Sequence, residues 1–259
     1  MPTVVACYAL KGGVGKTAAA VNLAWLAARD GHRTLLWDLD PQAAATFLLR
    51  SKAKVKGGTR KLLQGKSDVR DVVKETLYDG LELLPAEALY DSADLDLGET
   101  KRSDERVERV LRPLADSYDL IILDCPPGLS LLSTNIVNAA RLLLVPLVPS
   151  PLSLRTLDHV VELAAGVEPP NPQVMAFFSM VDSRRPLHRD VTALVQGKYA
   201  DVATATVPAS AVVERMGQRR APVEVFAPHS PAAAAFHALW MELAARLGLS
   251  ATALATVES

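Results

Sequence analysis

The sequence has few cysteines, no segment typical of a membrane span and almost no net charge. Cys7 and Cys125 are its only cysteines, too few for a disulfide framework or a multi-cysteine metal site within one chain, and they fit a reducing cytosol. Prolines interrupt the most apolar later run, at 142–149, and the first residues carry no basic segment, so nothing predicts membrane insertion or export. Because the formal net charge is -1, any binding to nucleic acid would need a local basic patch.

Other absences bear on domain organisation. The five histidines are scattered and form no metal-ligand spacing. No repeat, long linker or low-complexity segment divides the 259 residues, whose hydrophobic content of 49% and charged content of 22% are typical of a globular protein. We therefore expect a single domain over residues 1–259, with no helix-turn-helix module at its N-terminal end.

What the chain does have is a glycine-rich loop, Lys-Gly-Gly-Val-Gly-Lys-Thr, at residues 11–17. It follows an apolar run at 3–9 and precedes an Ala-rich segment at 18–28, and a strand, a loop and a helix in this order form the setting of a phosphate-binding loop. The glycines let backbone N–H groups converge on phosphate oxygens, and the helix N-terminus adds its positive end. Lys16 supplies a point charge and the Thr17 hydroxyl can ligate Mg²⁺. The loop therefore predicts a nucleotide site.

Aspartates follow two predicted strands, at the carboxyl ends where doubly wound sheets hold their ligands. Asp124 ends the apolar run 119–123, which is typical of a buried parallel strand that brings a carboxylate to Mg²⁺. Asp38 and Asp40 follow a strand expected at 34–37, and alternation predicts both on the same side. They can hold Mg²⁺ through water, orient the attacking water or connect to switch regions; the alternative is a turn carboxylate that caps the next helix.

Strand and helix patterns alternate through the rest of the chain. Further strands are expected at 81–86, 141–148, 174–181 and 202–207. Helices are expected at 18–30, at 99–117 as a charged surface helix interrupted at Pro113, from about 150 to near Gly166, and at 190–199, 209–216 and 231–247. This order predicts an α/β fold with one doubly wound, mainly parallel sheet that helices cover on both faces.

The first motif departs from the usual phosphate loop, because Leu10 stands where its first glycine is expected and a second lysine, Lys11, follows. Together with Asp-Leu-Asp-Pro-Gln at 38–42 and Asp-Cys-Pro-Pro at 124–127, this loop resembles the deviant Walker A motif of the ParA/MinD family of P-loop ATPases, and in particular its ParA-type members. The Ala-Ala at 43–44 departs from the Gly-Asn that is common in that family.

The resemblance implies ATP and Mg²⁺ as cofactors and gives roles to individual residues. Lys11 would reach the phosphates of the partner subunit, Lys16 would act on the bound phosphates, and Asp40 would position the hydrolytic water. The metal set would comprise Thr17, Asp38 and Asp124. The residues expected to contact the nucleotide are Lys11, Gly12, Gly13, Val14, Gly15, Lys16, Thr17, Ala18 and Pro208.

The resemblance also implies a function: a cytoplasmic ATP hydrolase that forms a homodimer with ATP, binds DNA without sequence preference and associates with the nucleoid in that state. A cargo-linked partner protein would stimulate its slow hydrolysis, and the cargo would be a plasmid, a chromosome or a large protein assembly. No membrane is involved in this reading.

Two basic regions compete for the DNA contact. One is the segment 50–74, which is followed by an acidic segment at 75–108; the basic segment can equally be a solvated loop. The other is a later set at predicted strand and helix ends, which we favour because ordered arginines lose less entropy and pair bidentately with phosphates. Its expected DNA-binding members are Arg184, Arg185, Arg189, Arg215, Arg219 and Arg220, with Lys198 nearby in sequence.

Other functions stay open at this point. A MinD-like membrane-cycling ATPase needs a basic amphipathic helix at its end, and residues 247–259 contain no Lys or Arg. A metabolic or redox enzyme on the same scaffold is a third reading, either an iron–sulfur reductase or an ATP-dependent ligase. Cys7 and Cys125 are expected on or against buried strands, which argues against a cluster that bridges subunits. A nucleotide sensor without turnover is a fourth.

Overall fold

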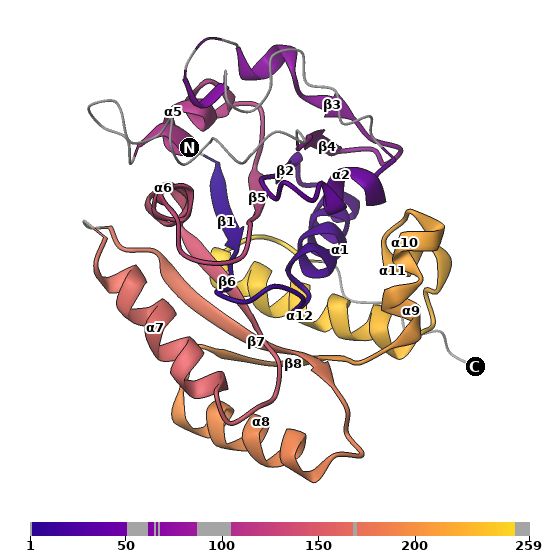
Figure 1. Ribbon diagram of the computed structural model, residues 1–259. Coiled ribbons are helices and arrows are strands. Elements are labelled where there is room, and N and C mark those ends of the chain that lie inside the picture. The colour runs from indigo at the N-terminus through magenta and orange to yellow at the C-terminus, as the bar shows by residue number, and fades with distance from the viewer. Residues whose placement is uncertain are drawn as a thin grey trace.

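The apolar runs form the strands of one eight-stranded sheet (Figure 1). The computed structural model describes residues 2–50, 62–64, 66, 68–86, 105–167 and 170–251. The spatial order of the strands is β3-β4-β2-β5-β1-β6-β7-β8, and every pairing is parallel except that of the short β3 with β4. The strands are β1 (Thr3–Cys7), β2 (Thr34–Asp38), β3 (Lys74–Glu75), β4 (Leu81–Leu84), β5 (Leu120–Asp124), β6 (Leu142–Leu147), β7 (Gln173–Val181) and β8 (Val202–Pro208).

Helices cover both faces of this sheet (Figure 1). Buried residues of α5, α6, α7 and α8 pack on one face, and those of α1, α2, α10, α11 and α12 pack on the other. The predicted doubly wound, mainly parallel α/β sheet is thereby confirmed. The helices are α1 (Lys16–Arg29), α2 (Ala44–Leu48), α5 (Arg106–Leu111), α6 (Leu131–Ala139), α7 (Ser153–Ala165), α8 (Pro186–Lys198), α9 (Ala211–Glu214), α10 (Met216–Arg219), α11 (Val223–Phe226) and α12 (Pro231–Leu247).

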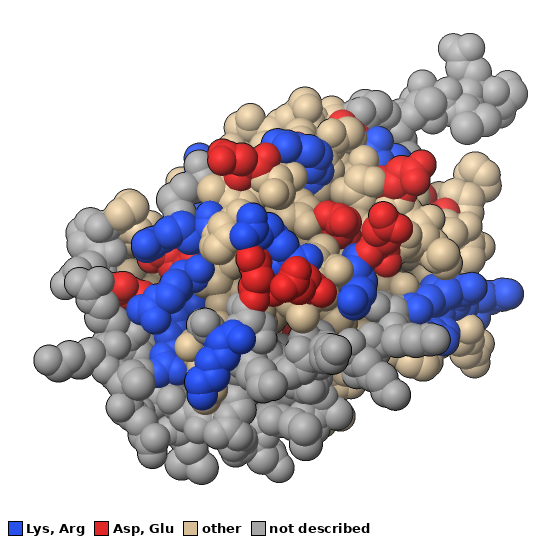
Figure 2. Space-filling model, turned by 90° about the horizontal axis from the view of Figure 1, so that it is seen from above, with Lys and Arg blue, Asp and Glu red and all other residues tan. Residues whose placement is uncertain are grey.

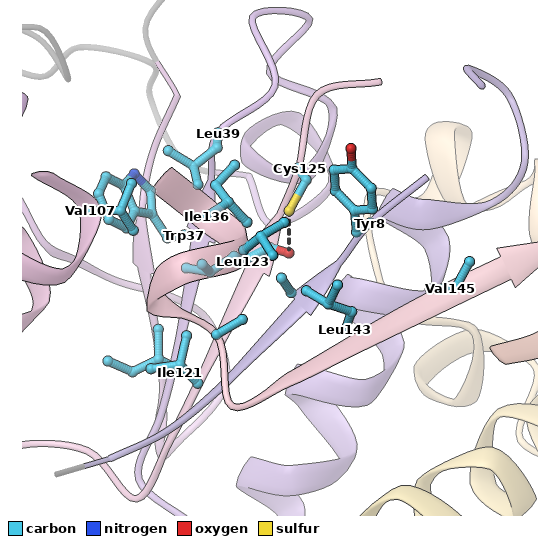
Figure 3. Close-up of a cluster of buried hydrophobic side chains, with 14 of the residues drawn as sticks. Tyr8, Trp37, Leu39, Val107, Ile121, Leu123, Cys125, Ile136, Leu143 and Val145 are labelled. Atoms are coloured by element: carbon cyan, nitrogen blue, oxygen red, sulfur yellow. Dashed lines mark hydrogen bonds between the residues drawn. The ribbon is translucent and has the colours of Figure 1, made fainter. Parts of the chain in front are cut away.

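The central strands are buried on both faces, which explains their continuous apolar sequences. Along β5, Ile121 and Leu123 enter the core beneath α6, whereas Leu120 and Ile122 enter the core beneath α1 and α12. Figure 3 shows the first of these cores, where Ile121 and Leu123 lie with Trp37 and Ile136. Because successive side chains point to opposite faces, one apolar strand supplies both cores.

Several element predictions are wrong in detail. The segment expected as a charged surface helix at 99–117 contains the short α5, whose Val107, Val110 and Leu111 are buried against the core; its residues 99–104 lie outside the described residues. In place of the helix expected at 209–216, the structure has the short α9 at Ala211–Glu214 and then α10, which starts at Met216. The helix expected at 190–199 already begins at Pro186, where proline fits the first helical turn.

The sequence prediction missed α2 and α6. The N-cap of α6 is Ser130, whose hydroxyl accepts a hydrogen bond from the Ser133 N–H at 3.1 Å.

Most of the basic segment, at 51–61, and most of the acidic segment, at 87–104, lie outside the described residues. Within the described ranges, none of the helices is both long and apolar enough to span a lipid bilayer.

Candidate nucleotide-binding site

The glycine-rich loop connects β1 to α1 and forms the floor of a cavity of about 600 Å³. Gly13 and Gly15 have left-handed backbone conformations, with φ of +72° and +94°, which residues with a Cβ rarely adopt. Lys16 is buried, and its ammonium Nζ donates to the Lys11 carbonyl at 3.4 Å. The cavity lining comprises Gly12, Gly13, Gly15, Lys16, Thr17, Ala18, Asp40, Pro41, Gln42, Pro126, Pro127 and Met180.

A second cavity, of about 350 Å³, adjoins the first, and its lining includes Phe177 and Phe236. The two share Gly15, Ala18 and Met180 in their linings. Sequence reasoning named Pro208, which lines this second cavity, but missed the aromatic side chains around it. The cavity lining comprises Gly15, Ala18, Phe177, Ser179, Met180, Val207, Pro208, Ala209, Ser210, Ala211, Val213, Glu214 and Phe236. A cavity lined by the phosphate loop that continues into one lined by aromatic side chains suits a ligand with phosphates at one end and an aromatic base at the other.

Asp124, at the end of β5, is a buried carboxylate whose oxygens accept no well-formed hydrogen bond from the described residues; the nearby Thr17 hydroxyl and Lys16 ammonium stabilise its charge only in part. Burial, reinforced by the negative charge of Asp38, raises the pKa of Asp124 well above its ordinary value. An unpaired buried carboxylate is unfavourable unless a cation compensates it. Within the described ranges no three His, Cys, Asp or Glu side chains form a metal site by themselves, so a cation here would also need hydroxyl, water or phosphate oxygens.

Asp38, at the end of β2, is also buried but accepts well-formed hydrogen bonds. Its Oδ2 accepts hydrogen bonds from the Thr46 hydroxyl at 2.7 Å and the Thr46 N–H at 2.8 Å, and its Oδ1 accepts one from the Asp40 N–H at 3.2 Å. The Thr46 hydroxyl in turn accepts from the Ala86 N–H at 2.9 Å. Burial raises the pKa of Asp38 to about 6. Asp38 thereby fixes α2 and the adjoining loop.

Asp40 and Lys11 are the two more accessible members of the predicted site. Asp40 lines the first cavity, and its carboxylate accepts a hydrogen bond from the Gln42 N–H at 2.9 Å. β2 ends at Asp38, and the Asp40 N–H donates to the Asp38 carboxylate, so the two aspartates lie close together beyond the strand. Lys11 is exposed, so its side chain can extend away from its own subunit.

The predicted DNA-binding arginines form two groups. Arg185 and Arg189 lie exposed at the start of α8, with no ion pair to any described residue, whereas the Arg184 guanidinium pairs with Asp182 at 2.9 Å. Lys198 ends the same helix, with its ammonium over the Tyr199 ring.

The second group lies around α10. Arg215 and Arg219 are exposed. Neither forms an ion pair with a residue in the described part of the chain. Arg220 is already engaged, because its guanidinium donates to the Phe47 carbonyl at 2.9 Å. Arg50, the first residue of the early basic segment, contacts this later group through the carbonyls of Arg219 and Arg220. The two sets that the sequence separates therefore meet at Arg50.

Of the early basic segment, only residues 50, 62–64, 66 and 68–74 are described. On the face seen from above in Figure 1, Lys and Arg side chains are interspersed with Asp and Glu (Figure 2). Among the described cations of the segment, Arg70 pairs with Asp68 at 2.6 Å. No single-sign surface appears among the described residues of that face.

A parallel sheet with a phosphate loop after its first strand and a buried carboxylate after β5 defines a P-loop nucleotide-binding protein of the doubly wound α/β class. Comparison with known proteins agrees with this class: residues 2–173 match the family model described as an AAA domain. The Bacillus subtilis sporulation initiation inhibitor protein Soj is 32% identical over 251 residues, which cover 95% of this chain and 99% of that relative. The Myxococcus xanthus chromosome partitioning protein ParA is 34% identical over 194 residues, 73% of this chain and 69% of the relative.

Among solved structures, cobyrinic acid a,c-diamide synthase from Mycobacterium smegmatis with bound ADP and magnesium superposes with a TM-score of 0.81. Its sequence is 26% identical, and the match covers 98% of this chain and 99% of that one. The chain belongs to the ParA/MinD family of P-loop ATPases.

Proposed function

We propose that this protein is a Mg²⁺-dependent ATP hydrolase whose residues 1–259 form one P-loop domain. Its ATP-bound dimer binds DNA without sequence preference and positions a cargo. The observation that carries the proposal is the buried Asp124 carboxylate, which accepts no well-formed hydrogen bond from the described residues, together with a phosphate-loop cavity that adjoins a cavity lined by Phe177 and Phe236. Support also comes from Soj and ParA, relatives named for sporulation and chromosome partitioning.

In this proposal the first cavity holds the phosphates of ATP and the second holds the base. Backbone N–H groups of the loop and the Lys16 ammonium bind the phosphate oxygens. The residues present fit Mg²⁺, because Thr17 offers a hydroxyl and Asp124 a buried carboxylate that accepts no well-formed hydrogen bond from the described residues; the ion would neutralise charge on the phosphates. Asp38 contributes through Thr46 and the Asp40 loop.

Hydrolysis is assigned to Asp40, which lines the phosphate cavity and orients the attacking water. Lys11, exposed on the same loop as Lys16, reaches the phosphates bound by a partner subunit. A lysine supplied across the interface makes the site complete only in the dimer, so turnover and dimerisation depend on each other. A cargo-linked partner protein that acts on this interface accelerates the slow basal turnover.

DNA binding is assigned to the exposed arginines of both groups, Arg185 and Arg189 on α8 and Arg215 and Arg219 around α10. Dimerisation doubles each group and therefore raises the local positive charge that a net charge of -1 does not provide. Binding through phosphates explains why no sequence preference is expected. The ATP-bound dimer is then held on the nucleoid in the cytoplasm.

The test is ATP turnover by the purified protein, measured with and without Mg²⁺ and with and without DNA. Asp124→Asn should bind Mg²⁺-ATP at least about tenfold more weakly, because a charged metal ligand is lost, while metal-free ATP binds as before. Asp119, a half-buried aspartate just before β5 that pairs with Arg33 at 2.7 Å, provides the control Asp119→Asn. ATP binding without Mg²⁺ dependence, or no turnover in any condition, would contradict the proposal.

The mycobacterial structure raises an ATP-dependent ligase as the second candidate, since that protein is named as a diamide synthase. A ligase consumes ATP only when its acid and amine substrates are present. Steady ADP release by the protein alone therefore favours the hydrolase. For a redox enzyme, the structure confirms that Cys7 and Cys125 are both buried, and burial raises the pKa of each thiol.

A further inference from the structure

The C-terminal ends of α2 and α10 face each other, and each is capped by an arginine from the other. Arg50, just beyond α2, donates from Nε to the Arg220 carbonyl at 3.2 Å and from Nη2 to the Arg219 carbonyl at 2.9 Å. Arg220, just beyond α10, donates from Nε to the Phe47 carbonyl at 2.9 Å and places its guanidinium 4.5 Å from the Phe47 ring centre. We call Phe47, Arg50, Arg219 and Arg220 the arginine clasp.

The clasp combines favourable electrostatics with unusual backbone geometry. Carbonyls at a helix C-terminus lack intrahelical donors and carry partial negative charge, so a guanidinium fork satisfies them well. Arg50 and Arg220 have left-handed backbones, with φ of 57° and 50°, which is unfavourable for residues with a Cβ. Each backbone turns so that the side chain reaches the other helix, and the four contacts offset that cost.

On its other side, α2 is fastened to the nucleotide site. The Ala43 N–H, at the N-cap of α2, donates to the Asp40 carbonyl at 2.8 Å. Thr46 within α2 donates to the Asp38 carboxylate through both its hydroxyl and its N–H. Because α2 spans only Ala44–Leu48, fewer than two helical turns separate the Asp40 loop from the clasp. A movement of that loop therefore displaces the clasp.

A second attachment joins α10 to α1, the helix that begins at the phosphate loop. Asn22 of α1 is buried, its amide donates to the Met216 Sδ at 3.4 Å, and its Oδ1 accepts from the Val223 N–H at 2.8 Å. Met216 starts α10 and Val223 starts α11, so Asn22 anchors both sides of the turn that carries Arg219. Figure 1 shows α10 beside α2. Both helices that leave the nucleotide site thus support α10.

From this geometry we infer that Arg50 is a positioning residue that couples the nucleotide loop to the arginines of α10. Contacts of the ATP phosphates with the Asp40 loop fix the position of α2. Because Arg50 follows α2 and is hydrogen-bonded to the carbonyls of Arg219 and Arg220, the backbone of those two residues is then fixed as well. The exposed Arg215 and Arg219 side chains are then held in one arrangement toward DNA. This inference rests on the proposed function for its DNA readout, but the coupling itself does not require DNA.

The decisive variant is Arg50→Lys, which keeps the positive charge but lacks the fork that caps two carbonyls. Affinity for random-sequence duplex DNA is measured by fluorescence anisotropy with Mg²⁺-ATP and with Mg²⁺-ADP. We expect the ratio of the two affinities to fall by about fivefold or more, while affinity for Mg²⁺-ATP stays unchanged. The control is Arg112→Lys, an exposed arginine on the opposite face of the sheet that pairs with Glu108 at 3.3 Å, and it should keep the wild-type ratio.

Hydrogen exchange at residues 216–220 provides a readout without DNA. In the wild type, ATP should slow exchange there, and in Arg50→Lys this protection should be lost. If the wild type binds no DNA in either state, the proposed function fails, whereas the exchange result still tests the coupling. An unchanged ATP-to-ADP ratio together with unchanged ATP protection in Arg50→Lys and Arg50→Ala would overturn the inference, even if both variants melt at lower temperature.

Discussion

Gly15→Ala is expected to reduce the free energy of unfolding by about 2–5 kcal/mol through two separable effects. The first is the left-handed backbone at φ +94°, which costs a residue with a Cβ about 1–2 kcal/mol. The second is a collision, because an added Cβ would lie 2.7 Å from the Ser179 Oγ. Ser179 is buried on β7 and lines the second cavity, so its hydroxyl must turn toward that cavity to relieve the collision, and such overpacking costs about 1–3 kcal/mol.

Two further variants separate these effects. Gly13 also has a left-handed backbone, at φ +72°, but an added Cβ there meets nothing within 4 Å, so Gly13→Ala should lose only the backbone contribution. Ser179→Ala removes the colliding hydroxyl and leaves the Ser179 Cβ at an ordinary 3.7 Å from the new methyl group. Added to Gly15→Ala, it should recover the collision contribution of about 1–3 kcal/mol.

The assay is urea unfolding of the four proteins and the wild type, without nucleotide, analysed as a double-mutant cycle between positions 15 and 179. Equal losses in Gly13→Ala and Gly15→Ala, with no coupling between Gly15 and Ser179, would refute the reasoning. That result would mean that the loop does not sit against β7 as the structure has it.

Further predictions concern the charged residues of the site. Lys16→Ala should abolish ATP binding in a labelled-nucleotide titration, because the phosphates lose their buried counter-charge, and an unchanged affinity would contradict the phosphate-loop assignment. Asp40→Ala should accumulate an ATP-bound dimer, because it binds ATP but does not hydrolyse it. Lys11→Ala should bind ATP only as a monomer. Light scattering with ATP measures the mass of both variants, and normal dimers from Lys11→Ala would rule out its role across the interface. Because burial raises the pKa of Asp38 from 3.8 to about 6, the folded state binds its proton more tightly, so the nucleotide-free protein should lose about 2 kcal/mol between pH 4 and 6, out of about 3 kcal/mol over the whole titration. Urea unfolding at each pH checks this, and Asp38→Asn should flatten the slope.

The sequence predicted best where one physical cause dominates. Strands β1, β5 and β6 are buried on both faces, so burial alone produces the apolar runs that mark them. The loop at 11–17 was equally clear, because close approach to phosphates demands glycine at set positions. Two of these glycines do have positive φ, at Gly13 and Gly15.

Prediction from the sequence failed for elements whose conformation is determined by tertiary contacts. Helix α6 contains Ser133, Thr134 and Asn135, which are poor helix formers, and its serine cap and buried Ile136 outweigh them. The segment that becomes α9, α10 and α11 has helical composition, but the hydrogen bonds of Asn22 and Arg50 break it into separate turns. The meeting of Arg50 with Arg219 and Arg220 joins positions about 170 residues apart, which no local pattern reports.

Asp38 and Asp124 show how two similar aspartates acquire different tasks. Each ends a buried parallel strand, and β2 and β5 are neighbours that pair Asp38 with Asp124. The Asp38 carboxylate is satisfied by three hydrogen bonds from Thr46 and Asp40, so it can stay ionised without a metal. Asp124 accepts no such bonds from the described residues and faces the negative charge of Asp38. The Thr17 hydroxyl and the Lys16 ammonium offset only part of this cost, and the proposal that Mg²⁺ enters with ATP therefore centres on Asp124, with Asp38 holding the loop that carries Asp40.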